Sequence, residues 1–279
     1  MARANLEDLL ASTPRGTAIP AFTCYNLEGA IGVIEAAENL KTAVCILLSD
    51  SSFKGRRGDL LCQALVALAD ASTVPACVQL DHVTDLQRIA HALELGVSSV
   101  MADGSKLPDA DNAQFVREAM TLAAHFGATV EAELGRIEGD EDRATNSRAG
   151  RMTAPDTAAR FVDETGIAVL AVSIGNVHGT YHRPPDLDWC RLADIQKSTA
   201  AHLSFHGASG VSNEDIATAI RTGIVKINVN TELREQWFAA TRESLPHAAD
   251  GWQILPVQEA VTSAIAVAAR GRILAYQAE

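Results

Sequence analysis

The segment that decides the fold is Ala201-His-Leu-Ser-Phe-His-Gly-Ala-Ser-Gly210. Residues 203–205 form a short run typical of the end of a buried strand, and the run leads directly to His206. A loop of small residues follows. Ser212 and Asp215 then form the capping-box pattern of a helix start. The segment therefore predicts one strand, a loop at its carboxyl end and one helix.

This strand–loop–helix unit recurs along the chain, and we count eight cycles. The predicted strands are residues 18–23, 43–49, 76–81, 98–103, 128–134, 168–174, 201–205 and 224–228. The predicted helices are residues 28–40, 60–71, 85–95, 112–126, 155–165, 187–197 and 213–221, with further helices after Thr231 and over residues 257–269. Eight repeats predict an α/β fold, a (β/α)8 TIM barrel with an additional C-terminal helix. A doubly wound open sheet is the alternative, but residues 21–28 lack the glycines of a dinucleotide-binding turn.

Length and composition fit one barrel domain that spans residues 1–279. Hydrophobic residues make up 47% of the chain, enough for a large core, and no long apolar run predicts a membrane span. Residues 1–14 lack the apolar region of a signal peptide, so we expect a cytoplasmic protein. The net charge of −12 disfavours binding to nucleic acids or anionic membranes. The five scattered cysteines indicate reduced thiols buried in the core.

Polar residues occupy one face of several predicted strands. Glu131 and Glu133 alternate with apolar residues, and the same spacing pairs Gln79 with Asp81, Lys226 with Asn228 and Ser99 with Asp103. If the apolar faces pack against the helices, these polar faces line the barrel interior near its mouth. Because burying so many polar groups is costly without pairing or a metal, the pattern indicates a functional site. A purely structural polar network is the alternative.

Three of the eight histidines stand out by their position relative to the predicted strands. His82, His178 and His206 each close or follow a predicted strand, at the end of the barrel where active sites form. Three imidazoles from three strands match a catalytic zinc site with an open position. Asp103 and Glu133, also at strand ends, are candidates to orient these ligands or to hold the metal in another position. The small residues 207–210 offer backbone N–H groups to an anion, although an ordinary β-to-α turn would look the same.

Six motifs follow one another in a recognisable order. They are Asp81-His82, Met101-Ala-Asp-Gly-Ser105, Glu131-Ala-Glu-Leu-Gly135, Gly175-Asn-Val-His-Gly179, His206-Gly-Ala-Ser-Gly210 and Lys226-Ile-Asn-Val-Asn-Thr-Glu-Leu233. In this order they resemble the motifs of class II, metal-dependent ketose-bisphosphate aldolases, from about Ala21 to Arg234. The chain length and the Thr-Glu-Leu ending look closer to the tagatose-bisphosphate branch than to the longer fructose-bisphosphate enzymes. The resemblance implies reversible cleavage of a ketose 1-phosphate or ketose bisphosphate into dihydroxyacetone phosphate and an aldehyde.

The resemblance also implies roles for individual residues. It places Zn²⁺ or another divalent metal on His82, His178 and His206, where it stabilises an enediolate. Asp81 matches the acid that transfers the proton at the aldehyde oxygen. Residues 136–152 resemble the family's mobile loop, in which Glu141 matches the residue that exchanges the enediolate proton. The positions that match those holding the phosphorylated sugar, with a monovalent cation (Na⁺ or K⁺) nearby, are Gly179, Gly207, Ser209, Asn228, Asn230 and Thr231.

Three departures from the family pattern bear on the substrate. Val83 replaces the usual glycine after His82 and is expected to narrow the adjacent loop. Asn230 stands where many fructose enzymes carry aspartate, so a contact to a substrate hydroxyl is expected to differ. The Asp-Pro-Arg motif, whose arginine binds the second phosphate from a neighbouring subunit, is missing, and the region reads Asp250-Gly-Trp-Gln253. We therefore predict an aldehyde that is unphosphorylated or carries another group, unless Arg56, Arg57 or Arg183 substitutes.

Three other functions stay open on the sequence alone. A Schiff-base aldolase would use Lys226, the only lysine within a predicted strand. A metal-dependent hydrolase in the same barrel would use the same histidines to activate water. A metal-stabilised accessory or regulatory subunit would have no turnover. The resemblance further implies a homodimer or homotetramer, with the C-terminal helix and the regions of Trp237 and Trp252 either at the contact or in the core.

Overall fold

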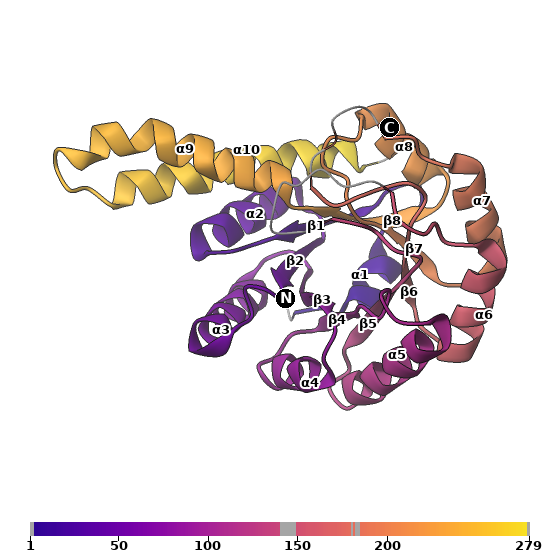
Figure 1. Cartoon of the computed structure of the whole chain (residues 1–279). Coiled ribbons are helices and arrows are strands. Elements are labelled where there is room, and N and C mark those ends of the chain that lie inside the picture. Colours follow the sequence, from indigo (N-terminus) through magenta and orange to yellow (C-terminus); the bar gives the residue numbers. More distant parts are fainter. Residues whose placement is uncertain (1–2, 140–148, 180, 182–184, 278–279) are drawn as a thin grey trace.

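The structure is a computed structural model that describes residues 3–139, 149–179, 181 and 185–277. Eight parallel strands form a closed barrel in which each strand pairs with the next and β8 pairs with β1 (Figure 1). The strands are β1 (Ile19–Thr23), β2 (Val44–Ser49), β3 (Ala76–Val83), β4 (Ser99–Ala102), β5 (Thr129–Leu134), β6 (Val169–Val172), β7 (His202–Phe205) and β8 (Ile224–Val229). The prediction of a (β/α)8 barrel is confirmed, and the open-sheet alternative is wrong.

Helices surround the barrel and close one of its ends. The surrounding helices are α2 (Leu27–Leu40), α3 (Gly55–Ala71), α4 (Leu86–Glu94), α5 (Asp109–Ala124), α6 (Pro155–Thr165), α7 (Trp189–Ser198) and α8 (Asn213–Arg221). A short helix, α1 (Leu6–Ser12), packs its leucines against Ile19, Cys45 and Cys77 at the amino-terminal ends of three strands. The bottom of the barrel is therefore sealed by apolar side chains.

The chain ends in a helical hairpin of α9 (Thr231–Ala249) and α10 (Leu255–Ala275), which extends well beyond the barrel (Figure 1). The additional C-terminal helix is thus confirmed, and α10 is longer than its apolar pattern predicted. None of the helices in the described part of the chain is both long and apolar enough to cross a bilayer.

Two expectations from the sequence need correction. α3 begins at Gly55, five residues before its predicted start, because its first turn contains Gly-Arg-Arg-Gly and no apolar residue to indicate a helix. Cys190 is exposed on α7, whereas the other four cysteines are free thiols in the core.

The α2–α10 crossing depends on one glycine. A Cβ atom at Gly32 would lie 2.5 Å from the carbonyl oxygen of Thr262, which is backbone and cannot rotate away. We expect Gly32→Ala to destabilise the protein by about 1–3 kcal/mol, as overpacking does. Gly271→Ala on α10 is the matched control: a Cβ there meets no atom within 4 Å, so this change should stabilise by about 0.5–1 kcal/mol. Urea unfolding would measure both changes, and equal effects would contradict the assignment.

Candidate active site

The barrel interior contains a buried carboxylate with four hydrogen-bond donors. Oε1 of Glu131 accepts hydrogen bonds from His206 Nε2 at 2.8 Å and Ser204 Oγ at 2.6 Å. Oε2 of the same residue accepts from Lys226 Nζ at 2.8 Å and Gln79 Nε2 at 2.9 Å. All five side chains are completely buried. The polar strand faces therefore do line the interior, and around Glu131 they form a hydrogen-bonded network.

Charge pairing keeps this network ionised. Burial alone would raise the pKa of Glu131, but the charge of Lys226 and the hydrogen bond from His206 outweigh it and hold that pKa well below its usual range. Burial would likewise lower the pKa of Lys226, yet Glu131 and Asp81 raise it. Lys226 also donates to Asn228 Oδ1 at 2.6 Å. A buried lysine held in its charged form is a poor nucleophile, which disfavours the Schiff-base alternative.

Asp81 and His82 are consecutive, yet both line the same cavity at the barrel mouth. In a regular strand they would point to opposite faces. Here His82 adopts a left-handed backbone conformation (φ 53°), and the register of β3 against β4 shifts between Leu80 and Val83. Val83 consequently lies in the apolar layer under the helices and is completely buried. The expectation that it narrows the loop beside His82 is wrong.

Three imidazoles meet at the mouth. The ligand atoms of His82, His178 and His206 all lie within 4.8 Å of one another, and His82 Nε2 is 3.0 Å from His206 Nδ1. The second ring nitrogen of two of these histidines contacts a carboxylate: His82 Nδ1 is 2.9 Å from Asp103 Oδ2, and His206 Nε2 is 2.8 Å from Glu131 Oε1. Carboxylates in this position fix the tautomer and ring orientation of metal-binding histidines. The donor set therefore fits a divalent metal with an open coordination position.

The loops that carry two of these histidines are in backbone contact. A Cβ atom at Gly207 would overlap the carbonyl oxygen of Val177, and Gly207 has a φ of 70°. Asn176 Nδ2 donates to the carbonyl oxygen of His206 at 2.9 Å. Only glycine permits this approach, which brings His178 and His206 from separate strands to one point.

A second donor group overlaps the first. The ligand atoms of His82, Asp103 and Glu133 also lie within 4.8 Å of one another, which agrees with the predicted alternative metal position. Burial and the nearby charge of Asp103 raise the pKa of Glu133 to about 7. Burial would also raise the pKa of Asp103, but its hydrogen bonds to His82 and Ser105 lower it instead. Of this pair, Glu133 is the one suited to carry a proton near neutral pH.

A small cavity adjoins the imidazole cluster. Its lining residues are His178, Gly179, Gly207, Ala208, Ser209, Asn228, Asn230 and Thr231. All six residues predicted to bind the substrate are therefore neighbours in space. Helix α9 begins at Thr231, so the positive end of its dipole lies beside the cavity. Asn230 is held by Tyr25, whose hydroxyl donates to Asn230 Oδ1 at 3.1 Å.

A larger cavity of about 400 Å³ opens on the other side of His178. It includes Asp81, Asp103 and the serines at the end of β2, Ser49 and Ser51. Glu141, Arg183 and most of the predicted mobile loop lie outside the described residues, so their predicted roles stay predictions.

The sequence predicts Glu131 only as one of the inward-facing polar residues, without a specific role, and it predicts no role for Tyr25, yet the structure ties both residues to the site. The sequence shows Glu131 only as the residue two places before Glu133 on the same strand face, and this spacing was the available signal. Nothing in the local sequence links Tyr25 with Asn230, because 205 positions separate them.

Comparison with known proteins agrees with this geometry. The family of class-II fructose-bisphosphate aldolases matches residues 4–274. The YdjI aldolase from Escherichia coli K12 is 31% identical, with a TM-score of 0.85 over 98% of this chain and 97% of that one. A candidate fructose-1,6-bisphosphate aldolase from Coccidioides immitis is also 31% identical, with a TM-score of 0.87 over 97% and 94% of the two chains. The chain therefore belongs to the class-II fructose-bisphosphate aldolase family and is an enzyme of the aldehyde-lyase type.

Proposed function

We propose that the protein catalyses the reversible aldol cleavage of a ketose 1-phosphate or ketose bisphosphate into dihydroxyacetone phosphate and an aldehyde. The observation that carries this proposal is the position of the small cavity, which shares His178 with the imidazole cluster and Gly207 with its loops. A phosphate bound to the small cavity would leave the carbonyl of the same molecule next to the three histidines. A metal-dependent hydrolase would need the three histidines but would not need a phosphate site beside them.

The proposed cofactor is a divalent metal, which the family generally uses, and nitrogen ligands of this kind favour Zn²⁺. His82, His178 and His206 would hold it, and it would supply Lewis-acid polarisation of the substrate carbonyl. Asp103 and Glu131 keep two of these rings in the tautomer that leaves a nitrogen available to the metal.

Asp81 is the proposed group that moves the proton at the aldehyde oxygen. Its two oxygens accept hydrogen bonds from Gln79 Nε2 and Asn228 Nδ2, both at 3.1 Å. The carboxylate is 1% exposed, but it lines the larger cavity beside His82. These contacts fix its direction, as general acid–base catalysis requires. Glu141 is the proposed partner for proton exchange at the carbon, and a monovalent cation near the phosphate is part of the same proposal.

The charged residues that line the larger cavity bear on whether the aldehyde carries a phosphate group. Among its described lining residues, the carboxylates Asp50, Asp81, Asp103 and Glu138 outnumber the cations Lys106 and Arg136. Arg136 is also paired with Glu138 at 2.9 Å. With a divalent metal on His82 and His178, which also line this cavity, these charges would balance and leave no surplus of positive charge for a second phosphate, so we propose an aldehyde without a phosphate group.

The expected result is that kcat/KM for a ketose 1-phosphate exceeds that for the corresponding bisphosphate by roughly tenfold or more. An unpaired charged group in the site costs about 1.5–3 kcal/mol in lost hydrogen bonds, which corresponds to that ratio. Cleavage kinetics on matched monophosphate and bisphosphate ketoses would measure it. A clear preference for the bisphosphate would show that a cation outside this cavity binds the second phosphate.

The reaction itself is tested by condensing dihydroxyacetone phosphate with a panel of aldehydes and assigning the product stereochemistry. We expect a chelator to remove activity and Zn²⁺ to restore it. Activity that survives the chelator and is lost on borohydride treatment would favour a Schiff base instead. Metal-dependent hydrolysis of ester or amide substrates without carbon–carbon cleavage would favour the hydrolase.

A further inference from the structure

The β2–α3 turn (residues 49–53) forms one wall of the larger cavity, to which Ser49, Asp50 and Ser51 contribute. The turn is compact, because the backbone N–H group of Ser52 donates to the carbonyl oxygen of Ser49 at 3.0 Å. The Ser49 hydroxyl lies 3.2 Å from that of Ser51 and donates to that of Ser52 at 2.9 Å. This wall therefore brings hydroxyl groups to the cavity in which the aldehyde would bind.

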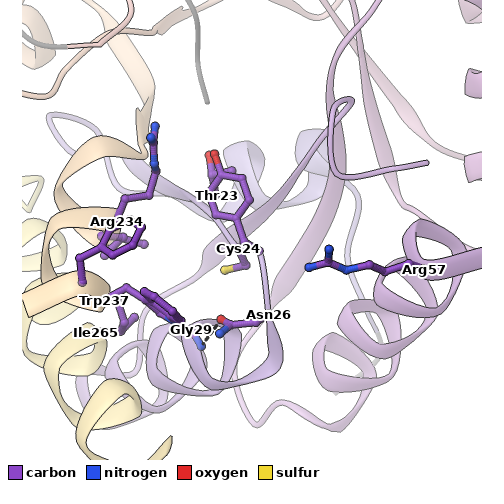
Figure 2. A pocket seen from close by; sticks show the side chains of 11 residues that line it. Thr23, Cys24, Asn26, Gly29, Arg57, Arg234, Trp237 and Ile265 are labelled. Carbon is purple, nitrogen blue, oxygen red and sulfur yellow. Dashed lines mark hydrogen bonds between the residues drawn. The ribbon is translucent and has the colours of Figure 1, made fainter. Parts of the chain in front are cut away.

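Helix α3 adds no cation to this wall. Its first turn carries Arg56 and Arg57 directly after the β2–α3 turn, yet none of the described residues that line the larger cavity belongs to α3. The guanidinium group of Arg57 extends toward the loop after β1, where it lines a separate apolar pocket of about 370 Å³ with Cys24 and Trp237 (Figure 2). The polar side chains that the β2–α3 turn offers to the larger cavity are therefore serine hydroxyls and the Asp50 carboxylate.

A side chain of α4, Arg88, holds the β2–α3 turn in this shape. Its Nε donates to Asp50 Oδ1 at 2.6 Å, and its Nη2 donates to the carbonyl oxygens of Asp50, at 2.7 Å, and of Phe53. The guanidinium carbon also lies 5.5 Å from the centre of the Phe53 ring. The planar fork of an arginine can reach several acceptors at once, whereas lysine is a point donor. Arg88 therefore ties both ends of the turn to α4.

We propose that Arg88 is a positioning residue for the aldehyde, an inference that rests on the proposed function. Arg88 is not among the described residues that line the larger cavity or the small one, so it acts through the turn. It fixes the direction in which Ser49 and Ser51 present their hydroxyl groups to the hydroxyl groups of the aldehyde. A site built to hydrogen-bond a substrate hydroxyl discriminates against an analogue that lacks it.

The geometry separates this role from those of the phosphate and the proton. The described residues that line the small cavity include none of the β2–α3 turn. The turn reaches Asp81 through the backbone, since the N–H group of Asp50 donates to the carbonyl oxygen of Asp81 at 3.1 Å. The carboxylate of Asp81 is held separately, by Gln79 and Asn228. Loss of Arg88 should therefore raise KM for the aldehyde with little change in kcat.

Condensation kinetics of the zinc-loaded protein with glyceraldehyde and propionaldehyde test the proposal. Both aldehydes have three carbons, but only glyceraldehyde carries hydroxyl groups beyond the carbonyl. We expect Arg88→Met to raise KM for glyceraldehyde by roughly tenfold, as the loss of one or two hydrogen bonds would, with kcat within about twofold. KM for propionaldehyde should change by less than about twofold, because it makes none of these contacts. The wild-type preference for glyceraldehyde should therefore largely disappear.

Two further variants control this measurement. Arg88→Lys keeps the positive charge but not the fork, so it should lose most of the preference as well, and it replaces Arg88→Met should that variant fold poorly. Arg3→Met is the matched control: Arg3 pairs with Asp70 at 3.1 Å, and its side chain is 26% exposed against 30% for Arg88. Arg3 lies next to the start of β3, away from the mouth, so its loss should leave both KM values unchanged.

Exchange of solvent protons into dihydroxyacetone phosphate, measured without an aldehyde, separates this inference from the proposed function. We expect the wild type and both Arg88 variants to exchange at rates within about twofold of one another. A wild type that exchanges no proton would refute the proposed function, and the role of Arg88 with it. Normal exchange in a wild type without a preference for glyceraldehyde, or in Arg88 variants that keep the preference, would overturn the role of Arg88 alone.

Discussion

Replacing His206 with alanine is expected to abolish tight metal binding and to lower kcat/KM by roughly 10³-fold or more. Lewis-acid stabilisation is worth several kcal/mol in a site of this kind, and each 1.36 kcal/mol is a factor of ten. Only two of the three imidazoles would then be left to bind the metal. Zinc titration and steady-state cleavage kinetics measure the two effects.

His202 provides the matched control because it lies at the other end of the same strand and is exposed. His202→Ala should change neither metal affinity nor kcat/KM. If His206→Ala retained stoichiometric zinc with near-normal affinity, the metal would be held by the second donor group, His82, Asp103 and Glu133, and the proposed site would be wrong.

Replacing Glu131 with alanine is expected to damage both folding and metal binding. Lys226 would be left as a buried cation without its carboxylate, and breaking a buried pair in this way costs about 3–5 kcal/mol. His206 would lose the acceptor at its Nε2, and loss of such a partner lowers metal affinity by about 10–100-fold. Urea unfolding of the metal-free protein gives the first quantity, and zinc titration gives the second.

The two effects can be separated with a second substitution. Glu131→Ala combined with Lys226→Met removes the buried charge, so it should recover much of the stability. It should not recover the metal affinity, because His206 still lacks its acceptor. Glu164→Ala, at an exposed position of α6, is the control for both measurements. A stability loss below about 1 kcal/mol in Glu131→Ala would contradict the pairing.

Much of the fold and the site could be predicted because both depend on local patterns. Alternating polar and apolar residues fix which face of each strand points inward, and closure of the barrel then brings His82, His178 and His206 together. The order of the strands in a parallel barrel follows from the order in the chain, so three residues far apart in sequence could be expected at one end.

What the sequence could not predict depends on backbone exceptions and on long-range pairs. The left-handed conformation of His82 turns two consecutive residues toward one cavity, against the alternation of a strand. The pairing of Glu131 with Lys226 joins β5 to β8, and no local signal marks it. Trp252 is exposed because the α9–α10 hairpin extends away from the barrel. The apolar pattern of α10 does not reveal in which direction the hairpin extends.

The helix that seals the bottom of the barrel, α1, also imposes an order on what the protein can take up. In the described part of the chain its leucines pack against the amino-terminal ends of the strands, so a metal and a substrate would enter the proposed site through the mouth. The imidazole cluster lies deep on that route and His206 is completely buried. Under the proposed function, the metal would therefore have to bind before the sugar phosphate, and the bound ketose would block its release.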